Sequence, residues 1–208
     1  MHSALEALPQ TNEREIAEYE RLHFLSAFLY WLALRVREIE GHKLDDFVRV
    51  EGVLWWRPED TTFPDGHMKV PAEMEAAFAR YTAHLSSRRV KLDRSVGQLP
   101  VLQSTLNFQP IGARRLHQIL KSLFAQAAGR LPPGASLARE QLMHASAHWL
   151  RHTGIKAVAS SGVSASETQG FARHAKFEST APYLASESEE QAHQRVQTRK
   201  LPAGWLPD

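Results

Sequence analysis

Residues 148–154 of this 208-residue chain read HWLRHTG. The apolar spacing around them predicts a helix over about 146–160 that ends at Gly162. His148 and Arg151 are three positions apart, so both side chains project from one face of that helix. Taken alone, the pair is better explained as partly buried polar residues of an ordinary helix. The residues that precede and follow the stretch decide between these interpretations.

Downstream of this helix, Ser164 and Glu167 have the spacing of a capping box and predict the start of a short helix. The sequence ARH follows at 172–174, and a last helix holds Tyr183, nine residues after His174. Taken singly, the histidine is explained by a loop position and the tyrosine by an amphipathic core position.

Upstream, the chain predicts a long helix that starts at Asn12, with Glu15 at the capping-box position, in a region that Gly41 ends. Apolar residues recur at helical intervals on one broad face. They are Ile16, Tyr19, Leu22, Leu25, Phe28, Leu29 and Leu32. Beyond this face, Arg35 and Glu38 have the spacing of an ion pair on a helix surface.

A small sheet follows. Residues 47–57, FVRVEGVLWWR, are rich in β-branched and aromatic types and predict a hairpin that turns at Glu51-Gly52, with at least one tryptophan in the core. A further strand over 67–70 is expected to pair with the second strand of the hairpin across the loop 58–66. This places an antiparallel sheet near the N-terminal side of the chain.

The remaining helices complete the fold class. Pro71 lies in the first turn of one helix, whose shared face carries Met74, Phe78, Tyr81 and Leu85. Residues 86–110 are expected to be mostly loop, and a helix over 112–128 stops at Gly129. We predict an α+β fold, mainly α-helical with a small antiparallel sheet. It forms a single domain over 1–208, with a core over about 12–190 and a tail over 191–208.

Composition and charge narrow the functional classes. With 43% hydrophobic and 23% charged residues, the chain has the composition of a folded protein, and its lack of cysteine excludes disulfides and thiolate chemistry. No uncharged apolar run approaches the roughly 18 residues that span a bilayer. The N-terminus is acidic, unlike a signal peptide, so we expect a cytoplasmic protein. Residues 84–130 hold eight Lys and Arg against one Asp, a segment that would attract a polyanion.

Together, LRVREIEGHKLDDF at 34–47, HWLRHTG, ARH and the following tyrosine form an ordered series. This series resembles the catalytic domain of the tyrosine recombinases, the phage-integrase family, over about residues 25–190. Arg35 matches the family's first-box arginine, and Glu38 matches the acidic residue three positions on. His148 and Arg151 match the second box, His174 matches the third box, and Tyr183 matches the nucleophile.

The resemblance implies a site-specific DNA recombinase, or integrase, that joins DNA to Tyr183 through a 3′-phosphotyrosyl link. Arg35 and Arg151 would hold the phosphate through planar, always protonated donors, and His174 would donate a hydrogen bond to it. His148 would be the general base toward a phenol whose ordinary pKa is about 10. The covalent link conserves the bond energy, so we expect neither ATP, metal nor other cofactor.

Three positions depart from the family pattern. The loop that usually carries a general-acid lysine has none here, which leaves Lys69 on the next strand, Arg57 on the preceding one, or no replacement. Arg173 stands where a glycine is common and is expected to alter how its loop approaches DNA. Trp149 replaces a frequent aspartate.

The resemblance also implies partners. Double-stranded DNA would lie along the basic segment, with Arg114, Arg115 and Lys121 contacting phosphates, and relatives assemble as tetramers on DNA. A nucleoid-associated location in the cytoplasm follows. Because Arg35 lies so near the start of the sequence, we expect the family's N-terminal core-binding domain to be missing from this chain, which fits either an excised domain or a short protein. The tail resembles the segment that relatives pack against a neighbouring protomer.

Other functions remain open. A type IB topoisomerase uses similar residues to relax supercoils, and a DNA-binding module of this fold could have lost catalysis. An unrelated helical interaction protein would not bind DNA in a salt-dependent manner. His144, His148 and His152 recur every four residues like a metal-binding face, but without a carboxylate partner we expect no zinc site.

Overall fold

The computed structural model describes residues 5–6, 8–57, 67–88 and 95–184. The tail over 191–208, the loop 58–66 and the basic residues Arg89, Lys91 and Arg94 lie outside the described residues. None of the described helices is both long enough and apolar enough to cross a membrane.

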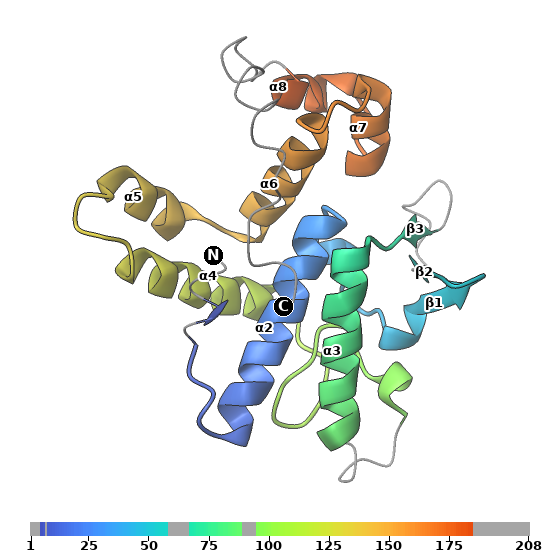
Figure 1. Ribbon diagram of the computed structural model, residues 1–208, viewed down its shortest axis with the longest axis vertical. Helices are drawn as coiled ribbons and strands as arrows, with labels where there is room; N and C mark the ends of the chain where they lie inside the picture. The colour runs from blue at the N-terminus through green and yellow to red at the C-terminus, as the bar shows by residue number, and fades with distance from the viewer. Residues whose placement is uncertain (1–4, 7, 58–66, 89–94, 185–208) are drawn as a thin grey trace.

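Helix α2 (Glu13–Trp31) is the central element, and it contacts both α3 and α6 (Figure 1). The side chain of Asn12 accepts a hydrogen bond from the amide of Glu15 at 3.0 Å, which confirms the predicted cap. The carboxylate of Glu15 accepts hydrogen bonds from the backbone N–H and the hydroxyl of Thr11, so it does not close the capping box. The helix ends ten residues before Gly41, because Ala33 adopts a left-handed conformation (φ 45°) and turns the chain.

The sheet has the order β1-β2-β3 and is antiparallel throughout, as predicted. Strand β1 (Phe47–Val50) pairs with β2 (Val53–Trp56), which in turn pairs with the two-residue β3 (Met68–Lys69). Glu51 and Gly52 both have positive φ, as a two-residue hairpin turn requires. Trp56 is fully buried and packs edge-on against Phe28, so the sheet is anchored to α2.

Helices α3 (Ala72–Arg88) and α4 (Ala113–Gly129) complete a continuous apolar core with α2 and the sheet. The stretch between them is irregular in its described part apart from the short 3₁₀ helix η4 (Val96–Gln98). The predicted apolar face of α4 is buried as expected. We call α2, the sheet, α3 and α4 the body.

Helix α5 (Ser136–His144) was not predicted from the sequence, and none of its residues is buried. It lies along α4 as an outlying arm (Figure 1). Its surface position removes the apolar period on which a sequence-based prediction depends.

Helix α6 (Ala147–Ala159) rises from the body toward α7 (Ala165–Ala172), and the short helices η5 (Phe177–Ser179) and α8 (Ala181–Leu184) follow (Figure 1). The predicted Ser164–Glu167 capping box is present. A separate small apolar cluster of Ala33, Ile155 and Ala172, packed by Phe171 and Tyr183, lies here. We call residues 151–184 the C-terminal unit.

Candidate active site

Arg151 is the buried anchor of the site. It lies on α6 with only 2% of its surface exposed, and its guanidinium donates hydrogen bonds to the carbonyl oxygens of Ala33 and Ala172. It therefore joins the segment after α2 to the end of α7. Burial, with Arg35 and Arg173 nearby, lowers the pKa of Arg151 to about 10, so it is protonated at neutral pH.

Arg35 reaches the same place from the other end of the chain. It caps the 3₁₀ helix η1 (Val36–Glu38), and its Nη1 donates to Oε1 of Glu38 at 2.7 Å, while its backbone N–H donates to Oε2 at 2.7 Å. About half of the Arg35 side chain is exposed (46%), in contrast to Arg151. The expected ion pair between Arg35 and Glu38 is thus present. It lies at a short 3₁₀ helix and holds a half-exposed arginine, instead of lying on the surface of a long helix.

Arg173 gives an unexpected third guanidinium. Its Nη2 donates to Oε2 of Glu38 at 3.0 Å and to the Ala33 carbonyl at 2.7 Å, and Nη1 donates to the Leu32 carbonyl at 3.1 Å. The side chain therefore points inward, and the expectation that Arg173 alters how its loop approaches DNA stays a prediction. The residue is left-handed (φ 52°), which accounts for a glycine being suitable at this position.

Glu38 is the common partner of these arginines. Burial would raise the pKa of its carboxyl, but the charge of Arg173 and the hydrogen bonds from Arg35 and Arg173 outweigh burial and lower it. The carboxylate is therefore ionised beside three guanidiniums, including Arg151 at 4.0 Å. One negative charge among three positive ones leaves an excess positive charge, which favours binding of an anion.

Two histidines and the tyrosine form a connected row on the exposed side of α6. Nε2 of His148 lies 2.7 Å from Nε2 of His152, and Nδ1 of His152 is hydrogen-bonded to the Tyr183 hydroxyl. The rings of His152 and Tyr183 are stacked with centroids 5.2 Å apart. Helix α8 thus holds the tyrosine against the face that carries His148 and Arg151.

The environment keeps the histidines of this row neutral. Burial, followed by Arg151 and Arg35, lowers the pKa of His148. Burial, followed by His148 and Arg151, lowers the pKa of His152. Burial raises the pKa of the Tyr183 phenol, although Arg151 acts in the opposite direction. The phenol is therefore protonated at neutral pH, and neutral imidazoles beside it can accept its proton.

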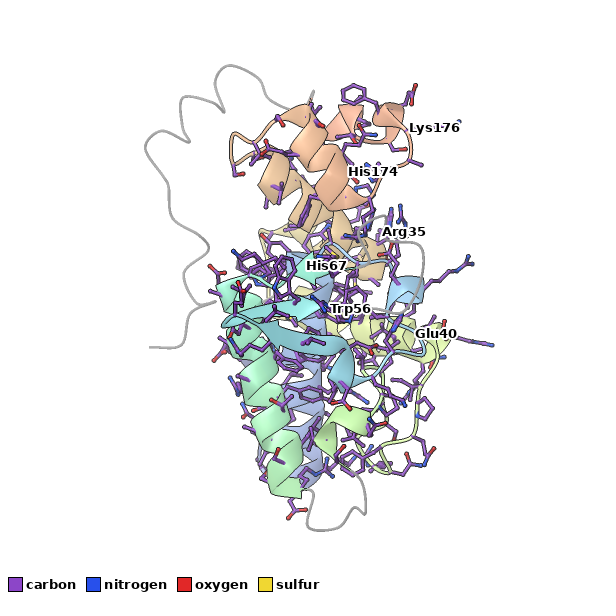
Figure 2. The ribbon with its side chains drawn as sticks, turned by 90° about the vertical axis from the view of Figure 1, so that its right-hand side faces the viewer. Arg35, Glu40, Trp56, His67, His174 and Lys176 are labelled. Carbon is purple, nitrogen blue, oxygen red and sulfur yellow. The ribbon has the colours of Figure 1, made fainter. Side chains whose placement is uncertain are left out.

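His174 completes the cluster from the loop after α7. Its Nδ1 lies 3.0 Å from the hydroxyl of the buried Thr180, its carbonyl accepts from Gln169, and its ring centroid is 6.0 Å from that of Tyr183. Burial, then Arg151 and Arg35, lowers its pKa. Because Nδ1 is engaged, Nε2 is the nitrogen that a ligand would meet. Arg35 and His174 lie on one side of the molecule (Figure 2).

The two candidates for the general acid are placed less tightly. Lys69 lies on β3 opposite Trp55, with an exposed side chain, and Arg57 directly follows β2 and donates its backbone N–H to the carbonyl of Asp46 at 2.7 Å. Among the described contacts, none joins either side chain to the arginine and histidine cluster. The choice between them stays a prediction.

The basic segment is only partly available at the surface. Arg88 donates to the Thr105 carbonyl and lies over the Phe108 ring, and Lys121 donates to the Met143 carbonyl of α5 at 3.0 Å. Arg115 bonds Gln118 and lines a cavity of about 230 Å³ between α2 and α4. Arg114 is exposed in the first turn of α4. The phosphate contacts predicted for Arg114, Arg115 and Lys121 stay predictions.

Comparison with known proteins places this site within a known fold. No protein-family model matches the sequence, and no curated protein matches it significantly. The arrangement of helices and sheet is that of the catalytic domain of tyrosine recombinases.

Three solved structures carry this conclusion. The chain is similar to the XerH site-specific recombinase bound to difH substrate (TM-score 0.61, 11% identity), covering 95% of this chain and 50% of that one. It is similar to the Tn1549 transposon integrase in complex with a circular intermediate DNA (TM-score 0.60, 16% identity, 94% and 62% covered) and to the XerA recombinase (TM-score 0.58, 17% identity, 96% and 62% covered). The chain therefore spans between half and two thirds of their lengths.

Sequence reasoning had named most of the cluster but missed two members. Arg173 was noted only as a departure from glycine, and His152 only as part of a repeating histidine pattern. The signal for His152 was its position four residues after His148, on the same helix face. Among the described residues, no three His, Asp or Glu side chains gather to hold a metal ion.

Proposed function

We propose that this chain is the catalytic part of a site-specific DNA recombinase that cuts and rejoins strands through a 3′-phosphotyrosyl intermediate. One observation carries the proposal. The Tyr183 hydroxyl is hydrogen-bonded to His152 on α6, and the same helix carries Arg151. Arg151 and Arg35 share Glu38 as a partner. These groups, which come from distant parts of the chain, would serve as the nucleophile, the neutral bases and the positive charge that binds an anion.

The arginines supply the electrostatic part of the mechanism. As a phenol oxygen attacks a phosphodiester, negative charge grows on the nonbridging oxygens of the pentavalent transition state. Arg35, whose side chain is about half exposed, offers donors to those oxygens, and His174 offers another from Nε2, while the buried Arg151 adds positive charge to the site. Glu38 restricts the orientation of Arg35, so less entropy is lost when the phosphate binds.

The covalent step exchanges one ester for another. The Tyr183 oxygen forms a bond to phosphorus, the bond from phosphorus to the 5′ oxygen breaks, and the phenol proton passes to an imidazole. A general acid, Lys69 or Arg57, protonates the leaving 5′ oxygen. The phosphotyrosyl bond retains the energy of the original ester, so rejoining to another strand needs no ATP.

Duplex DNA is the proposed substrate. The XerH and Tn1549 structures are described as complexes with DNA, and the excess positive charge around Glu38 suits a phosphate backbone. Arg114 on α4 would contact a phosphate and position the duplex without reading its sequence. We further propose assembly of several protomers on DNA, with the cytoplasm as the location.

The test is covalent capture on nicked duplexes. A pool of duplexes with a randomised stretch beside a nick is incubated with the protein, since the short fragment released by cleavage diffuses away and traps the adduct. Adducts stable to detergent are isolated, the DNA is sequenced, and the linked peptide is mapped. We expect a 3′-phosphate on Tyr183 and no adduct with Tyr183→Phe, whose DNA affinity should be nearly unchanged.

Each alternative gives a different result. Salt-sensitive DNA binding without any adduct would indicate an inactive binding module of this fold. Adducts on unrelated sequences together with relaxation of supercoiled plasmid would favour topoisomerase activity. Absence of salt-sensitive DNA binding would favour an interaction protein unrelated to DNA.

A further inference from the structure

His152 lies between the proposed nucleophile and the proposed general base. Its Nδ1 is hydrogen-bonded to the Tyr183 hydroxyl, and its Nε2 lies 2.7 Å from Nε2 of His148. We propose that His152 is a catalytic residue that accepts the Tyr183 proton and relays a proton to His148. The proposal rests on the proposed strand-cleavage function and specifies how its nucleophile is activated.

The contacts permit two directed sets of protons, and the relay requires the set that runs from Tyr183 to His148. If the phenol donates to Nδ1 of His152, that nitrogen has no hydrogen, so the neutral ring carries its hydrogen on Nε2. Nε2 of His152 then donates to Nε2 of His148, which must be unprotonated and leave its own hydrogen on Nδ1. In this set the phenol hydrogen is accepted by Nδ1 of His152 and the Nε2 hydrogen of His152 is accepted by His148, so the row is directed from Tyr183 to His148.

The proton moves along this row as the ester forms. The Tyr183 proton moves to Nδ1 of His152 while the hydrogen on Nε2 of His152 moves to Nε2 of His148, so His152 ends neutral and His148 ends as an imidazolium. The leaving 5′ oxygen takes its proton separately, from the general acid. On rejoining, the attacking 5′ hydroxyl returns a proton to that acid, and His148 returns its proton through His152 to the departing phenolate.

The charged surroundings favour transfer over storage of the proton. Arg151 adjoins both histidines, and Arg35 lies near His148, while the ring centroid of His174 lies 6.0 Å from that of Tyr183. Partial burial, and after it the charge of Arg151, lowers the pKa of both relay histidines, which keeps both rings neutral before reaction. A phosphate bound at the arginines would reduce this repulsion and help His148 to hold the arriving proton.

The sharpest variant keeps the ring and removes its nitrogens. His152→Phe can still stack on Tyr183, as His152 does at 5.2 Å, but it neither accepts nor donates the proton. A matched control is His144→Phe, the same change at an exposed histidine at the end of α5. Single-turnover adduct formation should slow by about 10²–10⁴-fold with His152→Phe, the usual range for a lost proton-transfer group, and stay unchanged with the control.

A second substrate separates the relay from the general acid. When sulfur replaces the leaving 5′ oxygen, the leaving group needs no proton because a thiolate is stable at neutral pH. The His152→Phe defect should persist on this substrate, whereas a defect of Lys69→Ala, if Lys69 is the acid, should disappear. Equal rates for His152→Phe and wild type on both substrates, or rescue of His152→Phe by sulfur, would overturn the relay.

A measurement on the free protein tests the relay without DNA. Nitrogen-15 NMR of the full chain with labelled histidines, assigned with the His148→Phe and His152→Phe variants, should show His152 protonated on Nε2 and His148 on Nδ1. The opposite tautomer of His152 would contradict the relay. If wild type forms no adduct on any duplex, the proposed function itself fails, and this result is distinct from a defect limited to His152.

Discussion

The body and the C-terminal unit are held together by different forces. In the body, large side chains such as Phe24, Phe28 and Trp56 are fully buried against one another. The C-terminal unit has a small cluster of Ala33, Ile155 and Ala172 and is tied to the segment after α2 by guanidinium hydrogen bonds. Apolar burial therefore stabilises the body, whereas charge-assisted bonds position the unit that carries Tyr183.

The arginines of the site have two roles, because they give the site its positive charge and also attach the C-terminal unit to the body. Arg151 and Arg173 both donate to the carbonyl oxygen of Ala33, so the charges that make the site positive also dock the C-terminal unit. Directional bonds define the geometry of a site more narrowly than apolar contact does. The consequence is a unit whose stability depends on charge, pH and a few close backbone contacts.

The largest effect is expected in the body. Phe24 is fully buried and stacks on Tyr81 with ring centroids 4.6 Å apart. Phe24→Ala should lower the free energy of unfolding by about 3–5 kcal/mol, because it removes buried apolar surface and leaves a cavity. Urea unfolding followed by circular dichroism measures this loss. A loss below about 1 kcal/mol would show that the body does not depend on this apolar cluster.

The matching change in the C-terminal unit is Arg173→Ala. It leaves Glu38 without its closest buried cation, and we expect a loss of about 3 kcal/mol, at the lower end for a broken buried ion pair because Arg35 still bonds the carboxylate. Arg173→Gly should lose about 1 kcal/mol less, since glycine adopts the left-handed conformation without strain. Hydrogen exchange of α7 amides measures both. Equal losses for the two variants would contradict the strain argument.

A smaller effect is expected where the two regions meet. Gly154 on α6 approaches the backbone of α2 so closely that an added Cβ would lie 2.2 Å from the carbonyl oxygen of Tyr30. Gly154→Ala should therefore destabilise the protein by about 1–3 kcal/mol, although alanine normally favours a helix.

The matched control for this prediction is Gly170→Ala in α7, where no atom lies within 4 Å of the added Cβ. It should gain up to about 1 kcal/mol from the helix propensity of alanine. Thermal unfolding of both variants checks the pair. A gain for Gly154→Ala would mean that α6 does not pack on α2 this closely.

The smallest effect is the response to pH, and its sign differs between the regions. Burial raises the pKa of Tyr81 in the body to about 12, so its contribution to stability is complete below pH 10 and is lost as the pH rises through about 12. In the C-terminal unit and on the turn of α6 just before it, burial and nearby arginines lower the pKa of His152, His174 and His148. The unfolded chain then binds protons more readily, so stability of the unit falls below about pH 6.5.

Hydrogen exchange, corrected for its intrinsic pH dependence, measures this response. Amides of α7 should lose protection between pH 7 and 5, whereas amides in the middle of α2 should keep theirs. Adduct formation should likewise stay constant from pH 8 to about 6.5 and decline only below it, because the accepting imidazoles must be neutral. Loss of protection in α2 first would reverse the comparison.

Short sequence patterns predicted the helix caps and the hairpin turn correctly, because each of these features depends on interactions between neighbouring residues. The cap at Asn12, the Glu51-Gly52 turn and the Ser164–Glu167 box were all predicted, since each depends on residues close together in the chain. Helix α5 was missed because it buries no residue and so has no apolar period. The end of α2 was missed because Ala33 adopts a conformation that its residue type does not indicate.

In the candidate site, the order of residues along the chain is enough to predict which residue types come close together on α6 and which loop and helix follow it. Helical geometry places His148, Arg151 and His152 close together whatever surrounds them. Packing in three dimensions sets the rest: Arg35 and Arg151 share Glu38 as a partner, Arg173 turns inward to Glu38, and the Tyr183 hydroxyl meets His152. The contacts of Arg173 with Glu38 and of Tyr183 with His152 join residues that are 135 and 31 positions apart. A short-range pattern carries no information about packing between such distant segments.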